Sequence, residues 1–133
     1  MDATYLVKFD IFLEKLLSIQ GKPDAKVANW FIAGDVRAPV FELYVAMRPQ
    51  TPEELTNLQG YEASKLILEI VSVCVSAENR NKGIFQTVLA RCINFAATHN
   101  MGVCLQVSKP IIRHVCKRDG FLFCGTMAYA FPT

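Results

Sequence analysis

The sequence lacks the features of several common protein classes. It has no apolar run of membrane-spanning length, and acidic Asp2 stands near the start where a secretory signal would carry basic residues before an apolar stretch. Its 14 basic and 12 acidic residues leave a net charge of +2, without the basic stripe of a nucleic-acid-binding protein. We therefore expect a cytoplasmic protein with no nucleic-acid partner and no membrane contact.

The sequence also lacks a C-x-x-C pair, although it contains five cysteines. All five lie inside apolar segments: Cys74, Cys92, Cys104, Cys116 and Cys124. An odd number without paired spacing argues against a zinc ribbon or a dithiol redox motif, so no metal site is predicted. The cysteines are expected to be reduced and to pack as small hydrophobic side chains.

The 133 residues are 52% hydrophobic and 20% charged, which suffices to bury a core without metal or disulfides. No repeat, low-complexity tract or linker divides the chain, so residues 1–133 are expected to form one domain. Helices are predicted over residues 5–19, 84–98 and 110–117 and just after Thr51; strands are predicted over 27–33, 40–47, 66–76, 103–107 and 121–130. This order predicts an α/β fold with a mixed sheet, antiparallel in the first hairpin and parallel across the 66–107 crossover.

The stretch from Leu66 to Thr98 organises the chain. It joins an apolar strand, which the composition predicts to be buried on both faces, to the polar loop AENRNKG and an amphipathic helix. Unpaired amides of the first helical turn and the positive end of the helix dipole would converge near Gly83, and Arg80 and Lys82 add positive charge. The pattern favours a phosphate or pyrophosphate site over an ordinary solvated loop.

Two short segments resemble the GNAT superfamily of acyltransferases. The strand end Val73-Cys74-Val75 and the loop Arg80-Asn81-Lys82-Gly83-Ile84-Phe85 are similar to that family's coenzyme-A-binding motif, with Phe85 where the family usually has a small residue. The resemblance implies that these residues bind acetyl-CoA, with the loop amides on the pyrophosphate and the strand backbone along the pantetheine arm.

A second segment, VCLQVSKPIIRHVCKRDGF, is similar to the family's next strand and helix, with Gly120-Phe121 as its Gly-Phe pair. Cys116 stands where the family carries the tyrosine that protonates the departing thiolate, and Ser108 stands where it often has asparagine. The resemblance implies a general-acid role for Cys116 and coenzyme contact for Ser108. Burial in an apolar setting would raise the pKa of the Cys116 thiol and oppose that role.

Glu69 is the obvious candidate for a general base, because it stands alone in an otherwise apolar strand. A carboxylate in that setting is expected to have a raised pKa and to accept a proton near neutral pH. The alternative is that Glu69 faces solvent or pairs with a cation such as Lys65.

The resemblance implies an acetyl-CoA-dependent N-acyltransferase in which an amine of a small molecule or protein attacks the thioester directly. Two alternatives remain open: a GNAT-like interaction module that lost the chemistry, and a protein that binds coenzyme A as a regulatory ligand. The family usually ends in two strands, whereas one is predicted after Gly120. The resulting open sheet edge predicts a homodimer.

Overall fold

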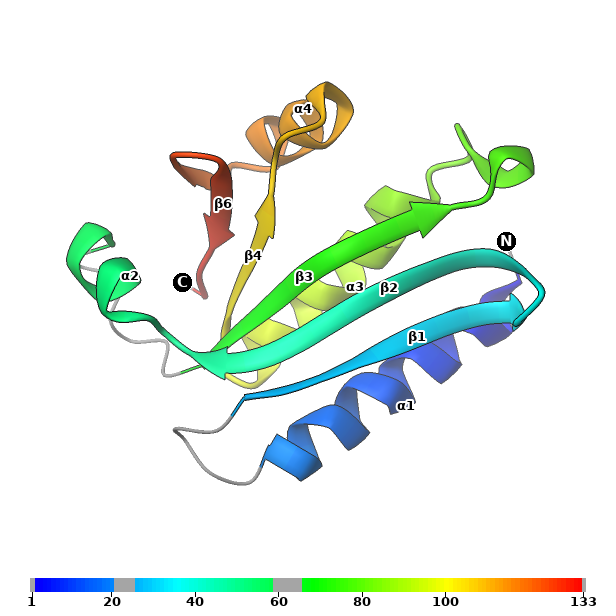
Figure 1. The fold of residues 1–133 in the computed structure, drawn as a ribbon, viewed down its shortest axis with the longest axis horizontal. Coiled ribbons are helices and arrows are strands. Elements are labelled where there is room, and N and C mark those ends of the chain that lie inside the picture. The colour runs from blue at the N-terminus through cyan, green and yellow to red at the C-terminus, as the bar shows by residue number, and fades with distance from the viewer. Residues whose placement is uncertain (1, 21–25, 59–65, 133) are drawn as a thin grey trace.

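The computed structural model describes residues 2–20, 26–58 and 66–132, which form a six-stranded sheet with helices packed on it (Figure 1). The elements in chain order are α1 (Ala3–Gln20), β1 (Val27–Asp35), β2 (Ala38–Pro49), α2 (Pro52–Asn57), β3 (Leu66–Val75), the 3-10 helix η1 (Ala77–Asn79), α3 (Ile84–Thr98), β4 (Gly102–Gln106), α4 (Pro110–Arg118), β5 (Leu122–Cys124) and β6 (Met127–Ala130). Within these ranges no helix is both long and apolar enough to cross a membrane.

The strand order in the sheet is β1-β2-β3-β4-β6-β5. The pair β3–β4 is parallel and the other pairs are antiparallel, so the predicted mixed α/β sheet is confirmed. The first hairpin turns at Val36 and Arg37, where Asp35 Oδ1 accepts a hydrogen bond of 2.9 Å from the Arg37 amide. That side-chain contact is a common way for aspartate to stabilise a turn.

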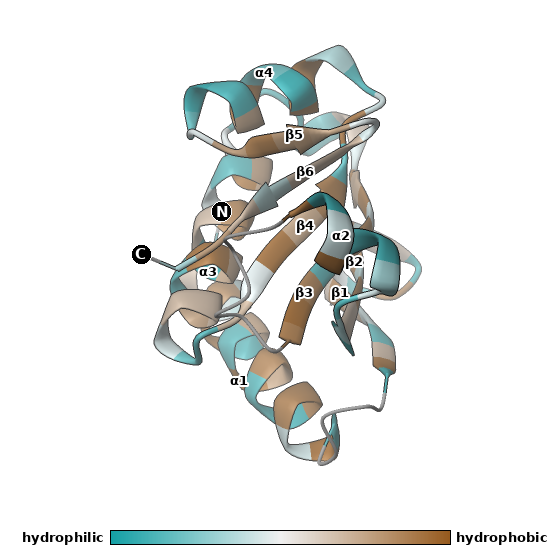
Figure 2. Cartoon of the chain, turned by 90° about the vertical axis from the view of Figure 1, so that its left-hand side faces the viewer, coloured by the Kyte–Doolittle hydropathy of each residue, from teal (hydrophilic) through white to brown (hydrophobic). Residues whose placement is uncertain are grey.

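The main hydrophobic core lies between the sheet and the two long helices α1 and α3. The apolar stripe of α1 buries Phe9, Leu13 and Leu16, as the helical period predicts. The central strands β3 and β4 are largely hydrophobic, whereas the outer surface of α4 is hydrophilic (Figure 2). A smaller cluster lies on the opposite face of the sheet and contains Leu58, Ile67, Cys104 and Tyr129.

The short helix α2 begins with the capping signal that the sequence shows. Thr51 Oγ1 accepts a hydrogen bond of 3.1 Å from the Glu54 amide, and Glu54 Oε1 accepts one of 2.9 Å from the Thr51 amide. This reciprocal capping box satisfies two amides that the helix itself leaves unpaired. It also fixes the Glu54 carboxylate over the sheet.

The prediction that the whole of the 66–76 strand is buried on both faces is wrong for its second half. Residues Ile67 to Ile70 pair with β4, but no pairing with β4 continues beyond Ile70. Val71 is bulged, because Tyr44 pairs with Ser72 while the next residue, Val45, pairs with Ile70. The strands β3 and β4 then diverge (Figure 1), and Val71 is 43% exposed.

The prediction of one strand over residues 121–130 is also wrong. Residues 122–130 form a hairpin in which β6 lies between β4 and β5. The two strands are joined by Gly125 and Thr126, and Gly125 has φ +61°, a left-handed conformation that glycine adopts without strain. The chain therefore supplies the second strand whose expected absence was the reason for predicting a homodimer, and β5 is the last strand on this side of the sheet.

Candidate functional site

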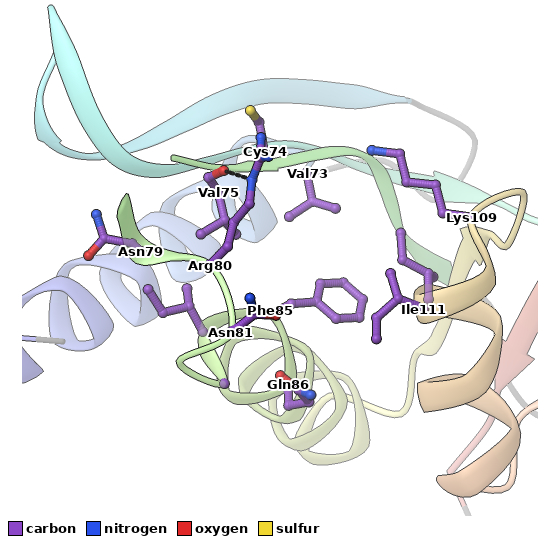
Figure 3. A pocket seen from close by; sticks show the side chains of 13 residues that line it. Val73, Cys74, Val75, Asn79, Arg80, Asn81, Phe85, Gln86, Lys109 and Ile111 are labelled. Atoms are coloured by element: carbon purple, nitrogen blue, oxygen red, sulfur yellow. Dashed lines mark hydrogen bonds between the residues drawn. The ribbon is translucent and has the colours of Figure 1, made fainter. Parts of the chain in front are cut away.

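A cavity of about 530 Å³ opens where β3 and β4 diverge, between the end of β3, the loop that follows it and the first turns of α3 and α4 (Figure 3). Eight of the ten residues predicted to bind coenzyme line it: Val73, Cys74, Val75, Arg80, Asn81, Gly83, Ile84 and Phe85. The predicted strand end, residues 73–75, and the predicted loop, residues 80–85, therefore line the same cavity.

The other two predicted residues lie elsewhere. Lys82 is exposed and does not line the cavity, so its charge is not directed into the site. Ser108 lines an adjoining cavity of about 160 Å³ between β3, β4 and the start of α4. Sequence reasoning missed five residues of the larger cavity: Asn79, Gln86, Lys109, Ile111 and Ile112.

The N-terminus of α3 faces this cavity without a side-chain cap. The N-cap residue is Gly83, with φ +74°, and Thr87 donates the first hydrogen bond of the helix, 3.0 Å to the Gly83 carbonyl. The amides of Ile84, Phe85 and Gln86 therefore have no acceptor within the helix and present the positive end of its dipole to a ligand. A Cβ built on Gly83 would approach only Gln86 Oε1, at 3.9 Å, so glycine is required here by the left-handed backbone and not by crowding.

Arg80 is held at the lining of the cavity by the strand that precedes it. Its Nε donates a hydrogen bond of 3.1 Å to the Val75 carbonyl, drawn as a dashed line in Figure 3. This hydrogen bond keeps the Arg80 guanidinium beside the end of β3. A fixed guanidinium next to uncapped helix amides is a suitable site for a phosphate group.

The free edge of β3 provides a second kind of binding surface. Strand β2 occupies one edge of β3 as far as Val75, whereas β4 leaves the other edge after Ile70. Within the described residues, every second amide and carbonyl between Val71 and Val75 therefore points away from β2 with no strand to pair with, and among these groups the Val75 carbonyl accepts the bond from Arg80. An extended polar chain with amide groups matches such an edge.

The bulky Phe85 is half-buried and lines the cavity. In Figure 3 its ring lies across the space between β3 and α4, pointing toward Ile111. The side chain thus occupies part of the volume that a smaller residue would leave open.

Glu69 lies on the opposite face of β3 from the core and pairs with a cation. Arg48 Nε donates a hydrogen bond of 2.8 Å to Glu69 Oε1, and the Glu69 side chain is 21% exposed. The alternative reading of Glu69 as an ion-pair partner is thus correct, with Arg48 as the cation; Lys65 lies outside the described residues. Glu69 lines neither of the two cavities, and its role as a base stays a prediction.

Arg48 is shared with a second carboxylate. Its two terminal nitrogens bond the two oxygens of Glu54 at 2.6 and 3.0 Å, and the Tyr129 hydroxyl donates a hydrogen bond of 2.7 Å to Glu54 Oε2. Burial opposes ionisation of Glu54, but the bonds from Arg48, the Thr51 amide and Tyr129 outweigh it and lower the pKa to about 2. Burial and the Glu54 carboxylate raise the pKa of Tyr129.

Cys116, the residue predicted to act as general acid, is fully buried in the core beneath α4. It lines neither the 530 Å³ cavity nor the adjoining one. Burial raises the pKa of its thiol to about 11, as expected for an apolar setting. The structure therefore does not bring this thiol to the site.

The sequence matches no protein family model and no curated protein. Solved structures with a similar fold include NAA60 of Arabidopsis thaliana in complex with a bisubstrate analogue, with a TM-score of 0.58 and 16% identity over 71% of this chain and 66% of that one. The NatC complex bound to Gag peptide and CoA has a TM-score of 0.55 and 12% identity, covering 92% of this chain and 79% of the other.

A third similar structure is AtaT complexed with acetyl-methionyl-tRNAfMet, with a TM-score of 0.58 and 10% identity over 79% of this chain and 71% of that one. Because this structure contains RNA, the comparisons do not support the expectation that nucleic acid has no part in the function. Identities at this level show likeness of fold. The chain has the fold of the GNAT acetyltransferases.

Proposed function

We propose that the protein is an acetyl-CoA-dependent N-acetyltransferase that moves an acetyl group to an amine of a small molecule or a protein. The observation that carries this proposal is the convergence of an uncapped helix N-terminus, Arg80 and the free edge of β3 on one cavity. Solved structures of similar fold contain acetyl-CoA or CoA, which agrees with this use of the cavity.

Acetyl-CoA would lie along the cavity with its pyrophosphate at the start of α3 and its acetyl group near the point where β3 and β4 separate. Its pyrophosphate would accept hydrogen bonds from the amides of residues 84–86 and from Arg80, at the positive end of α3. Its pantetheine amides would pair with the free edge of β3 between Val75 and Val71. The acetyl group would then reach the point where β3 and β4 separate.

The reaction would be a direct displacement. The amine nitrogen bonds to the thioester carbonyl carbon, and the carbon–sulfur bond breaks with its electron pair on sulfur. Backbone amides of the bulged part of β3 would stabilise the oxyanion that forms on the carbonyl. Glu69, which precedes the bulge by two residues, would accept the proton of the amine.

Calorimetric titration with acetyl-CoA tests the proposal. Wild type is expected to bind, and the variants Arg80→Ala and Gly83→Trp are expected to lose most of the affinity, because one removes the fixed charge and the other fills the approach to the helix amides. Lys82→Ala is the matched control, since Lys82 lies in the same loop and does not line the cavity. The proposal would be wrong if the wild type did not bind acetyl-CoA, or if Lys82→Ala lost as much affinity as the two cavity variants.

Two observations favour a second candidate, a GNAT-like binding module without catalysis. The Phe85 ring occupies part of the cavity, and the Cys116 thiol is enclosed in the core. One outcome would support this candidate, with the coenzyme as a regulatory ligand: the protein binds acetyl-CoA but transfers no acetyl group, and releases no CoA, when offered a panel of peptides, lysine derivatives and polyamines. A protein that does not bind acetyl-CoA would support an interaction module.

A further inference from the structure

Lys109 stands where the two cavities meet. It is the N-cap residue of α4, three residues after the end of β4, on the far side of the gap from β3. Both cavities are lined by Lys109, Val73 and Ile112, so these three residues form their common wall. In Figure 3 the Lys109 side chain extends from the start of α4 toward β3.

Lys109 is exposed, and no other group in the described part of the chain binds its ammonium. Within residues 2–20, 26–58 and 66–132 it has neither a hydrogen-bond acceptor nor a carboxylate partner. Among the described residues it is also the one charged side chain that lines the smaller cavity, whose other polar groups are Ser72, Gln106 and Ser108. A cation with no protein partner at the wall of a cavity is available to a ligand that develops negative charge.

The smaller cavity is where the sulfur of the coenzyme would lie if the proposed function is correct. With the pyrophosphate at the start of α3, the pantetheine arm follows β3 backward from Val75 and ends where the pairing with β4 begins, at Ile70. Ile70, Val71 and Ser72 line the smaller cavity from the β3 side. The thioester would therefore face Lys109 across the gap.

We propose that Lys109 binds the leaving thiolate of coenzyme A as an ion pair and stabilises it as it departs. This inference rests on the proposed function. As the amine nitrogen bonds to the acetyl carbon, the carbon–sulfur bond breaks and its electron pair stays on sulfur. The sulfur leaves as a thiolate paired with the Lys109 ammonium. The proton that the attacking amine gives up goes to Glu69, and solvent protonates the thiolate once CoA departs.

The surroundings of Lys109 favour the thiolate. The polar and titratable residues that line the two cavities with it include Ser72 and Cys74 from β3, Gln106 from β4 and Arg80 across the larger cavity; in Figure 3 the Cys74 thiol points away from Lys109. On its own helix Arg113 and His114 are exposed, and Arg113 packs over the Phe123 ring at 5.0 Å. No carboxylate lines either cavity in the described part of the chain, and the two charged side chains that do line them, Arg80 and Lys109, are both cationic.

The thiol of bound CoA provides a test that needs no acceptor. The absorbance of the thiolate is followed against pH for the complex with CoA, and the same titration with desulfo-CoA, which has no sulfur, is subtracted to remove the protein's cysteines. In the wild type the pKa of the bound thiol is expected to fall by about one unit below that of free CoA. Lys109→Met is expected to abolish this shift and Lys109→Arg to keep it, and the control Lys82→Met is expected to behave as the wild type.

The affinities for CoA and desulfo-CoA separate the possible outcomes. The proposal requires Lys109→Met to bind desulfo-CoA within about twofold of the wild type, since no lost contact involves the phosphates. An equal loss of affinity for both ligands would place Lys109 on a phosphate and overturn the proposal. A wild type that binds CoA with an unshifted thiol pKa would overturn the role of Lys109 alone, whereas a wild type that binds neither ligand would overturn the proposed function as well.

Discussion

Arg48 Nε donates a hydrogen bond of 2.8 Å to Glu69 Oε1, which ties the candidate base on β3 to the neighbouring strand β2. The same guanidinium binds both oxygens of Glu54, so Arg48 stays ionised and in place whatever the state of Glu69. Glu69 is thus oriented by a fixed cation and still 21% exposed. The ion pair fixes the orientation of the Glu69 carboxylate, and its partial exposure leaves it accessible to an amine.

Glu69→Gln tests this role. The amide oxygen of glutamine still accepts the hydrogen bond from Arg48, but the side chain no longer takes up a proton. We expect acetyl transfer to fall about 100-fold or more and the affinity for acetyl-CoA to stay within about twofold. Acetyl transfer is measured by the release of CoA in the presence of a panel of amines, and the affinity for acetyl-CoA is measured by calorimetry. Glu42→Gln, on the adjacent strand, is the control, and unchanged turnover in Glu69→Gln would exclude it as the base.

The Glu54 carboxylate predicts a specific dependence of stability on pH. Its pKa in the folded protein is lowered to about 2, so the stability it adds is fully present above the ordinary carboxyl pKa and is lost as the pH falls through that value toward about 2. We expect Glu54→Gln to lower the free energy of unfolding by about 3 kcal/mol at neutral pH and by progressively less in acid.

Urea unfolding of the wild type and Glu54→Gln between neutral pH and about pH 3 measures this difference. Glu53→Gln is the matched control, because its side chain is exposed on the same helix. A difference between wild type and Glu54→Gln that stays constant across the pH range would contradict the lowered pKa.

Phe85→Ala tests whether the aromatic ring limits the site. The ring lies in the cavity, so its removal is expected to raise the affinity for acetyl-CoA several-fold, at a cost of about 1–3 kcal/mol in stability because Phe85 also packs against the core. Calorimetry and thermal unfolding measure the two effects. Affinity that falls on truncation would mean that the ring contacts the ligand instead of excluding it.

Cys116→Ala tests the general acid that the family motif predicts. Because the thiol is fully buried away from both cavities, we expect the variant to lose about 1–2 kcal/mol of stability and to retain both turnover and the titration of bound CoA. A loss of turnover beyond tenfold in protein that circular dichroism shows to be folded would return the acid role to Cys116.

Much of this fold follows from local patterns in the sequence. The helical period places Phe9, Leu13 and Leu16 on one face of α1, and Thr51 with Glu54 marks the start of α2. The form of the loop over residues 80–85 was predictable for the same reason, because its residues are contiguous and a strand, a polar turn and a helix start suffice to align their amides. The turn at Gly125 also carried a local signal, a glycine within an apolar run, that the single-strand prediction passed over.

Tertiary structure alone decided the rest, because those features depend on residues far apart in the chain. Lys109 reaches the site because the parallel crossover sets β4 beside β3 and because the bulge at Val71 then lets the two strands diverge. Arg48 and Glu69 are 21 residues apart, and Glu54 and Tyr129 are 75 apart, so no local spacing indicates these pairs. Cys116 sits at a motif position in the sequence, but the packing of α4 turns its thiol into the core. Local order was determined by the sequence directly; which side chains share a cavity was determined by strand pairing.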